Sequence, residues 1–122
     1  MAIFGDISLD TYKMLTGKIS LSAAETSAFE TVAGNGDAGA AGALGGHYRG
    51  KSGRLEDQLE ALKWFAIGSA LAARAGNRSQ QVDIGRCYMV VEAELRVHWS
   101  DKIAEAQSRV SEWVTAFRSR MG

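Results

Sequence analysis

The segment from Arg86 to Met121 most constrains the fold, because its 36 residues contain neither glycine nor proline. With the residues just before it, it carries apolar side chains in steps of three and four, as on one face of an α-helix. The stripe comprises Ile84, Tyr88, Val91, Leu95, Trp99, Ile103, Ala106, Val110, Trp113, Phe117 and Met121. One straight helix would be roughly 55 Å long, whereas a globule of this size has a radius of gyration of about 14 Å. The helix must therefore break, project, or be buried against a second copy of the chain.

Ser100-Asp101 is the predicted position of a break. Serine is a good N-cap and aspartate suits a helix N-terminus, so a second helix can begin there and run back along the first. A rival interpretation is a strand, because apolar and polar residues alternate between Val91 and Trp99. The helical period continues on both sides of this stretch, which favours the helix.

The rest of the chain also predicts helices. A short one is expected from Ser8 to Leu15, and a second from the capping box formed by Ser22 and Glu25 to about Gly34. A third is expected over residues 54–75, with two apolar stripes that require neighbours on more than one side. Its Gly68 should let a neighbouring helix approach closely. Asn77 or Ser79 is expected to cap the next helix.

Residues 34–53 hold eight of the chain's 14 glycines. Glycine at this density costs so much backbone entropy that we predict a flexible loop over 34–53. The predicted fold is therefore a single helical domain over residues 1–122. It is an all-α bundle of four or five helices, with a Gly-rich loop between the second and third and a long or once-broken C-terminal helix.

Composition limits the classes of function. The 14 basic and 14 acidic residues balance, which disfavours binding to nucleic acid. No run is long enough to span a bilayer as a helix, and no helix has the dense basic face of a membrane-surface helix. The single Cys87 excludes an internal disulfide, and we see no secretory signal, so a cytoplasmic location is expected. The Ala-, Gly- and Arg-rich composition is associated with GC-rich bacterial or phage genomes.

One motif points to phosphate. The run from Gly45 to Ser52 fits the pattern G-x-x-x-x-G-K-[ST], in which backbone N–H groups cradle phosphates and the lysine reaches the outer ones. The candidate anion-binding residues are Gly45, Gly50, Lys51 and Ser52. The residues before this run are glycine and alanine rather than a buried strand, so the alternative is a flexible loop without a ligand.

A second cluster could bind a metal or support catalysis. Glu94, His98, Asp101 and Glu105 would share one face of an unbroken helix. Carboxylate sites in helical bundles need partner ligands from other helices, and His47 is the only other histidine. We therefore expect a solvated face with ion pairs such as Glu105–Arg109, no metal, no cofactor, and a buried structural thiol at Cys87.

The C-terminal stripe yields the main functional hypothesis. Trp and Met are enriched where proteins bury anchor residues, so the stripe is a candidate interaction face as well as a candidate core. Its predicted residues are Trp99, Ile103, Val110, Trp113, Phe117 and Met121. We expect a non-catalytic interaction protein, such as an adaptor, inhibitor or assembly subunit, that binds another protein or forms a homo-oligomer. The alternatives are a phosphate- or nucleotide-binding module at Gly45–Ser52 and a small helical enzyme or metal-binding protein around His98.

Overall fold

The computed structural model of the chain describes residues 13–14, 16–51 and 53–121, and all regular structure in this part is helical. The helices are α3 (Ala23–Gly34), α4 (Ala38–Arg49), α5 (Leu55–Arg74), α6 (Arg78–Trp99) and α7 (Ile103–Met121), with a 3₁₀ turn, η1 (Ser100–Lys102), before α7. The all-α bundle with a once-broken C-terminal helix is confirmed. The short helix predicted over 8–15 lies almost wholly outside the described residues.

Local capping signals set the helix starts. Ser22 and Glu25 form the predicted capping box: the Ser22 Oγ accepts from Glu25 N–H at 3.1 Å, and a Glu25 carboxylate oxygen accepts from Ser22 N–H at 2.9 Å. Asp37 and Asn77 cap α4 and α6 in the same way, each accepting from a backbone N–H three residues on at 3.0 Å. These side chains satisfy N–H groups that a helix start leaves without a partner.

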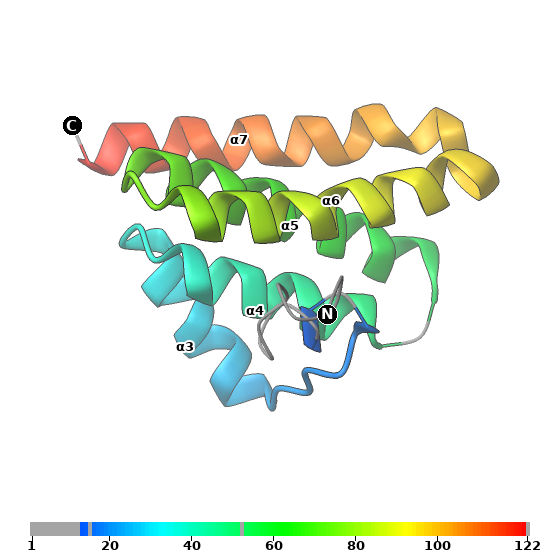
Figure 1. Cartoon of the computed structure of the whole chain (residues 1–122), viewed down its shortest axis with the longest axis horizontal. Helices are drawn as coiled ribbons and strands as arrows, with labels where there is room; N and C mark the ends of the chain where they lie inside the picture. The colour runs from blue at the N-terminus through cyan, green and yellow to red at the C-terminus, as the bar shows by residue number, and fades with distance from the viewer. Residues whose placement is uncertain (1–12, 15, 52, 122) are drawn as a thin grey trace.

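The break at Ser100 turns the chain through a hairpin. Helix α6 ends at Trp99, and α7 runs back beside α5 and α6 (Figure 1). The long C-terminal segment therefore folds back on its own chain and does not need a second copy to bury its apolar face. Residues 91–99 lie in α6, so the alternative strand interpretation is wrong.

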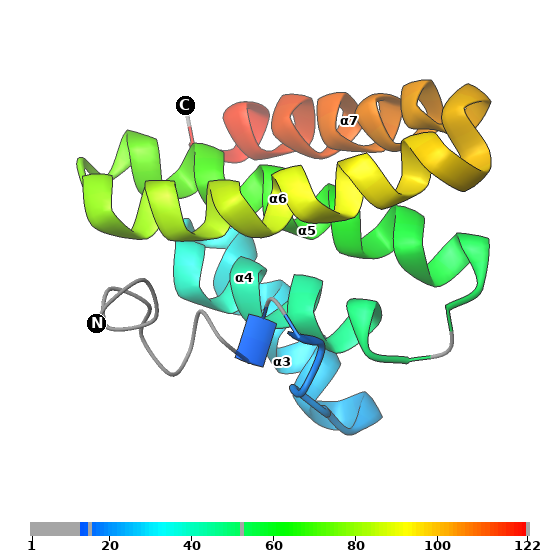
Figure 2. The same cartoon turned by 45° about the vertical axis from the view of Figure 1, so that its right-hand side comes forward.

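Helix α5 is central, as predicted from its two stripes. It packs against α4, α6 and α7, while α3 packs on the far side of α4 (Figures 1 and 2). Its buried side chains include Leu59, Leu62, Phe65 and Ile67. In the described part of the chain, no helix is long and apolar enough to cross a membrane.

The predicted Gly-rich loop over 34–53 is wrong for its main part, because residues 38–49 form α4. Three of the four glycines in α4, Gly42, Gly45 and Gly46, lie where other chain segments come too close for a side chain. A Cβ at Gly45 would lie 2.5 Å from the Phe65 ring, and one at Gly46 would lie 2.9 Å from the Met14 Cα. Each helical glycine costs about 1 kcal/mol relative to alanine, and burial of neighbours such as Leu44 and Phe65 offsets this cost.

The α4–α5 contact depends on small residues in both helices. Gly68 of α5 faces the α4 backbone, and a Cβ there would lie 3.3 Å from the Ala38 carbonyl oxygen and from the Gly42 nitrogen. The close approach predicted from Gly68 is therefore confirmed. What the sequence pattern did not reveal is that the approaching helix is the Gly-rich segment itself.

Candidate interaction surface

The predicted interaction face on α7 lies mostly against the chain's own core. Ile103 and Phe117 are only 5% and 4% exposed. Trp113 is half-buried and meets the ring of Trp64 on α5 edge-on, with the ring centroids 6.1 Å apart. It also stacks on Phe117 at 5.2 Å. These residues are not available to a partner while α7 stays in place.

The other predicted residues of this face differ in exposure. Trp99 and Val110 are partly buried against the core, and only Met121, 45% exposed at the end of α7, is open. The side of α7 that faces α5 therefore has an intramolecular role.

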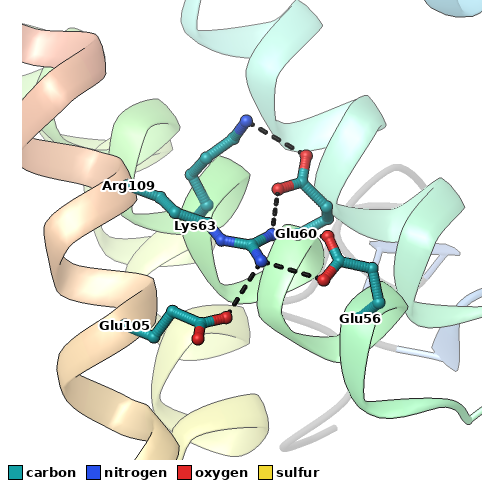
Figure 3. Close-up of polar contacts among 5 residues, drawn as sticks. All are labelled: Glu56, Glu60, Lys63, Glu105 and Arg109. Atoms are coloured by element: carbon teal, nitrogen blue, oxygen red, sulfur yellow. Dashed lines mark hydrogen bonds and ion pairs between the residues drawn. The ribbon is translucent and has the colours of Figure 1, made fainter.

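A group of charged side chains joins α7 to α5 (Figure 3). The Arg109 guanidinium donates to Glu56 and to Glu60 on α5, each at 2.7 Å, and to Glu105 on its own helix at 3.0 Å. Lys63 pairs with Glu60 at 3.0 Å. The hydrogen bond from Arg109 lowers the pKa of Glu56, and the same contacts raise the pKa of Arg109. The predicted Glu105–Arg109 pair is thus part of a larger network between two helices.

The outer face of α6 carries the surplus apolar surface. Val82, Met89 and Val97 are 42%, 66% and 77% exposed. At about 100° per residue, all three lie within about 80° of one another around the helix axis. Ala93, also exposed, lies between them. These four residues are called here the outer stripe.

Helix α6 therefore carries exposed apolar residues on the side opposite its buried side, with the exposed Arg86 among them. Its buried residues are Ile84, Cys87, Val91 and Leu95. The centre of that buried set lies about 160° around the helix from the centre of the outer stripe. A single exposed valine is ordinary on a protein surface, but aligned apolar residues on a helix with an already buried face form a patch that a partner can cover.

The outer stripe was not predicted from the sequence. The predicted apolar stripe of this helix runs through Ile84 and Leu95, and Val97 entered only the strand alternative. The available signal was the spacing of Val82, Met89, Ala93 and Val97, which is also helical. Only the structure distinguishes the stripe that is buried from the one that is open.

The predicted anion site does not form a phosphate-binding loop. Gly45 is buried inside α4, and Gly50 ends that helix, donating its N–H to the Gly46 carbonyl at 3.2 Å. The Lys51 N–H donates to the Tyr48 carbonyl, and its ammonium group lies over the Tyr48 ring at 5.7 Å. Ser52 lies outside the described residues. These N–H groups end a helix instead of forming a cradle, and the next helix begins with acidic residues, so the described residues do not have the loop geometry on which the prediction of anion binding rested.

The predicted acidic and histidine face is divided by the hairpin. Glu94 and His98 lie on α6, Asp101 in η1, and Glu105 on α7 beside Arg109. The four residues therefore do not share one helix face. Nowhere in the described residues do three or more His, Cys, Asp or Glu side chains come together as a group able to hold a metal.

A cleft of about 490 Å³ has Glu94 and His98 among its lining residues. Arg49 at the end of α4 donates two hydrogen bonds to the Glu94 carboxylate, at 2.9 and 3.0 Å. This pairing lowers the pKa of Glu94. The guanidinium and the carboxylate neutralise each other, so their geometry serves to join α4 to α6.

A cavity of about 550 Å³ lies between α3, α4 and the start of α6, with Phe29, Ala40 and Ile84 among its apolar lining residues.

Cys87 is buried, and this burial raises the pKa of its thiol to about 11. A thiol with such a pKa is a poor nucleophile near neutral pH, in agreement with the structural role expected for it.

Comparison of this chain with protein-family models, with curated proteins and with solved structures finds no match.

Proposed function

We propose that this chain is a non-catalytic interaction protein that self-associates through the outer stripe of α6. The observation that supports the proposal is that α6 has a buried apolar face and, on the opposite side, the exposed apolar residues of the outer stripe around Arg86. Covering Met89 and Val97 removes apolar area from water, and methionine adapts to the shape of a partner.

A second copy of the chain is the partner that this surface fits best. Most homodimers use the same patch on both subunits, related by a twofold axis. An antiparallel pairing centred on Val90 would place Val82 near Val97 of the second copy, with the two Met89 side chains near the middle. The same pairing brings Arg86 level with Glu94 of the second copy. The Glu94 side chain is 55% exposed, so it has an open side for this contact.

This role also suits the polar features of the structure. The Arg109 and Arg49 ion pairs join helices of the same chain, and Cys87 is buried, so each has a structural explanation without a reaction. A role as an adaptor or assembly subunit, in a reducing compartment such as the cytoplasm, belongs to the same proposal. The association is expected to be weak, since a narrow stripe buries little area.

The test is light scattering coupled to size exclusion, from micromolar concentrations to about 1 mM, a range that covers weak association. The mass of the wild-type protein should rise reversibly from monomer to dimer. Met89→Lys should keep it monomeric with an unchanged thermal midpoint, because the side chain is 66% exposed. The matched control is Met121→Lys, which lies on α7 and outside the outer stripe of α6, and this variant should dimerise normally. A wild-type protein that is monomeric throughout, or a dimer unaffected by Met89→Lys, would refute the proposal.

A further inference from the structure

The joint between α6 and α7 differs from the other joints between described helices. A glycine with positive φ lies in each of the other three: Gly36 (102°) before α4, Gly53 (71°) before α5 and Gly76 (74°) before α6. Such glycines make a turn that a continuing helix would have to undo. The α6–α7 joint has no glycine, and no proline occurs anywhere in the chain.

The hairpin depends on the backbone of one residue. Trp99 has φ −146° and ψ 55°, outside the helical region, whereas Ser100 (−58°, −30°) and Ile103 (−58°, −40°) already have helical dihedrals. If Trp99 became helical, α6 and α7 would join into one helix of roughly 66 Å, at about 1.5 Å per residue. The apolar stripe keeps its helical spacing through this joint, so the sequence is compatible with both forms.

Opening the hairpin in an isolated chain would expose a large apolar surface. Ile103, Ala106 and Phe117 are buried against the bundle, and Trp113 packs on Trp64. The α5 surface left behind would also lose the Arg109 contacts to Glu56 and Glu60. The segment that replaces all of these contacts is α7 of a second copy, because it carries the same side chains at the same spacing.

We propose that the chain forms a second, slowly exchanging dimer in which α6 and α7 are one continuous helix and each α7 packs on α5 of the other copy. This surface differs from the outer stripe, so the inference goes beyond the proposed function. Exchange of an identical element between protomers keeps the native contacts and changes only the hinge. It is slow because the buried Phe117 must leave the core before the second copy can replace it.

Complementation between two charge variants tests the exchange. Arg109→Glu places a fourth carboxylate beside Glu56, Glu60 and Glu105, and the double variant Glu56→Lys/Glu60→Lys gathers positive charge around Arg109. Each should lower the thermal midpoint on its own. The two are mixed, held near the midpoint of denaturant unfolding, and returned to buffer. A heterodimer with a midpoint restored towards that of the wild type is expected, because α7 of the first variant then meets α5 of the second. A mixture that behaves as the sum of its parts would overturn the proposal.

Ser100→Pro gives an independent test that does not depend on the stability of the charge variants. Proline fixes φ near the value that Ser100 has in the hairpin and disfavours helical dihedrals at the preceding residue, and Trp99 is already non-helical there. In the continuous helix it would lie in the interior and break it. The variant should keep the monomer's thermal midpoint and lower the yield of exchanged dimer at least tenfold after the same treatment. An unchanged yield would overturn the proposal. Met89→Lys should leave the yield unaltered, which separates this dimer from association through the outer stripe.

Discussion

Replacing Gly45 by alanine tests whether α4 is packed as tightly as the structure indicates. The added Cβ would lie 2.5 Å from two ring atoms of Phe65 and 2.9 Å from a third. Phe65 is fully buried, so its ring cannot turn out into solvent to make room for the added Cβ without leaving the core. Overpacking of this kind costs typically 1–3 kcal/mol, and we take about 3 because three atoms of a buried ring are involved.

The same substitution also brings a gain. Alanine is about 1 kcal/mol more favourable than glycine in a helix interior. The net effect of Gly45→Ala is therefore a loss of about 2 kcal/mol in the free energy of unfolding. For a domain of this size the thermal midpoint should fall by roughly 6–10 °C.

Gly85→Ala is the matched control, because Gly85 also lies inside a helix without positive φ. A Cβ there would lie 3.7 Å from the Ser69 hydroxyl oxygen, an ordinary contact. This variant should gain up to about 1 kcal/mol. Urea unfolding followed by circular dichroism measures both changes. A Gly45→Ala protein that is as stable as the wild type, or more stable, would show that residues 38–49 are not packed against Phe65, and the argument for a Gly-rich core helix would fail.

Three further predictions concern the polar network around Arg109, His47 in α4 and the buried thiol of Cys87. Arg109→Met keeps an apolar stem but leaves Glu56, Glu60 and Glu105 without the guanidinium, so denaturant unfolding should show that the free energy of unfolding falls by about 1–2 kcal/mol, and by less in high salt. The control is Arg96→Met, which removes an exposed pair with Glu92 within one helix and should cost at most about 0.5 kcal/mol. Equal losses in the two variants would refute a special role for Arg109. His47 Nδ1 accepts from the Leu21 N–H at 3.1 Å, and burial, followed by the charge of Lys51, lowers the pKa of His47. Folding thus favours neutral His47, so its contribution to the free energy of unfolding is complete above the unfolded pKa of about 6.5 and is lost as the pH falls through the lower folded pKa. Unfolding curves from pH 7.5 to 5 should show this loss of stability, and His47→Asn should make the loss smaller. Cys87, whose pKa burial raises to about 11, should react with a thiol reagent at pH 8 only after denaturant is added, and rapid labelling of the native protein would contradict its burial.

The helix starts that could be predicted from the sequence are those fixed by residues close by in the chain. The capping box of Ser22 and Glu25 and the cap at Asn77 act within three residues, so they can be identified without knowing the fold. The break at Ser100 was also predictable, because serine and aspartate mark a helix start and the alternative length was physically implausible.

Helix α4 could not be predicted, because its compensation is not local. The entropic cost of Gly45 and Gly46 is evident in the sequence, whereas the packing that offsets it comes from Phe65, Ile19 and Met14, distant along the chain. A glycine-rich loop and a glycine-rich buried helix therefore have the same local appearance.

The candidate interaction surface was also hard to predict from the sequence, because it too depends on contacts between distant segments. Periodicity identified the apolar face of α7 but not what covers it, and the structure covers Phe117 with the same chain's α5 and Arg74. The outer stripe has the same periodicity and stays open. Burial is a property of the assembled fold, so no pattern within α6 or α7 alone assigns one face to the core and the other to a partner.

The most direct test of the central claim is the rate of methionine oxidation by peroxide at two protein concentrations, measured by mass spectrometry. Exposure governs this rate, and Met89, Met121 and Met14 are 66%, 45% and 8% exposed. In dilute protein Met89 should be oxidised fastest and Met14 slowest. In concentrated protein Met89 should become protected while Met121 keeps its rate, as expected if the outer stripe of α6 is open in the monomer and covered on association. Slow oxidation of Met89 in dilute protein, or a rate that does not change with concentration, would contradict the account.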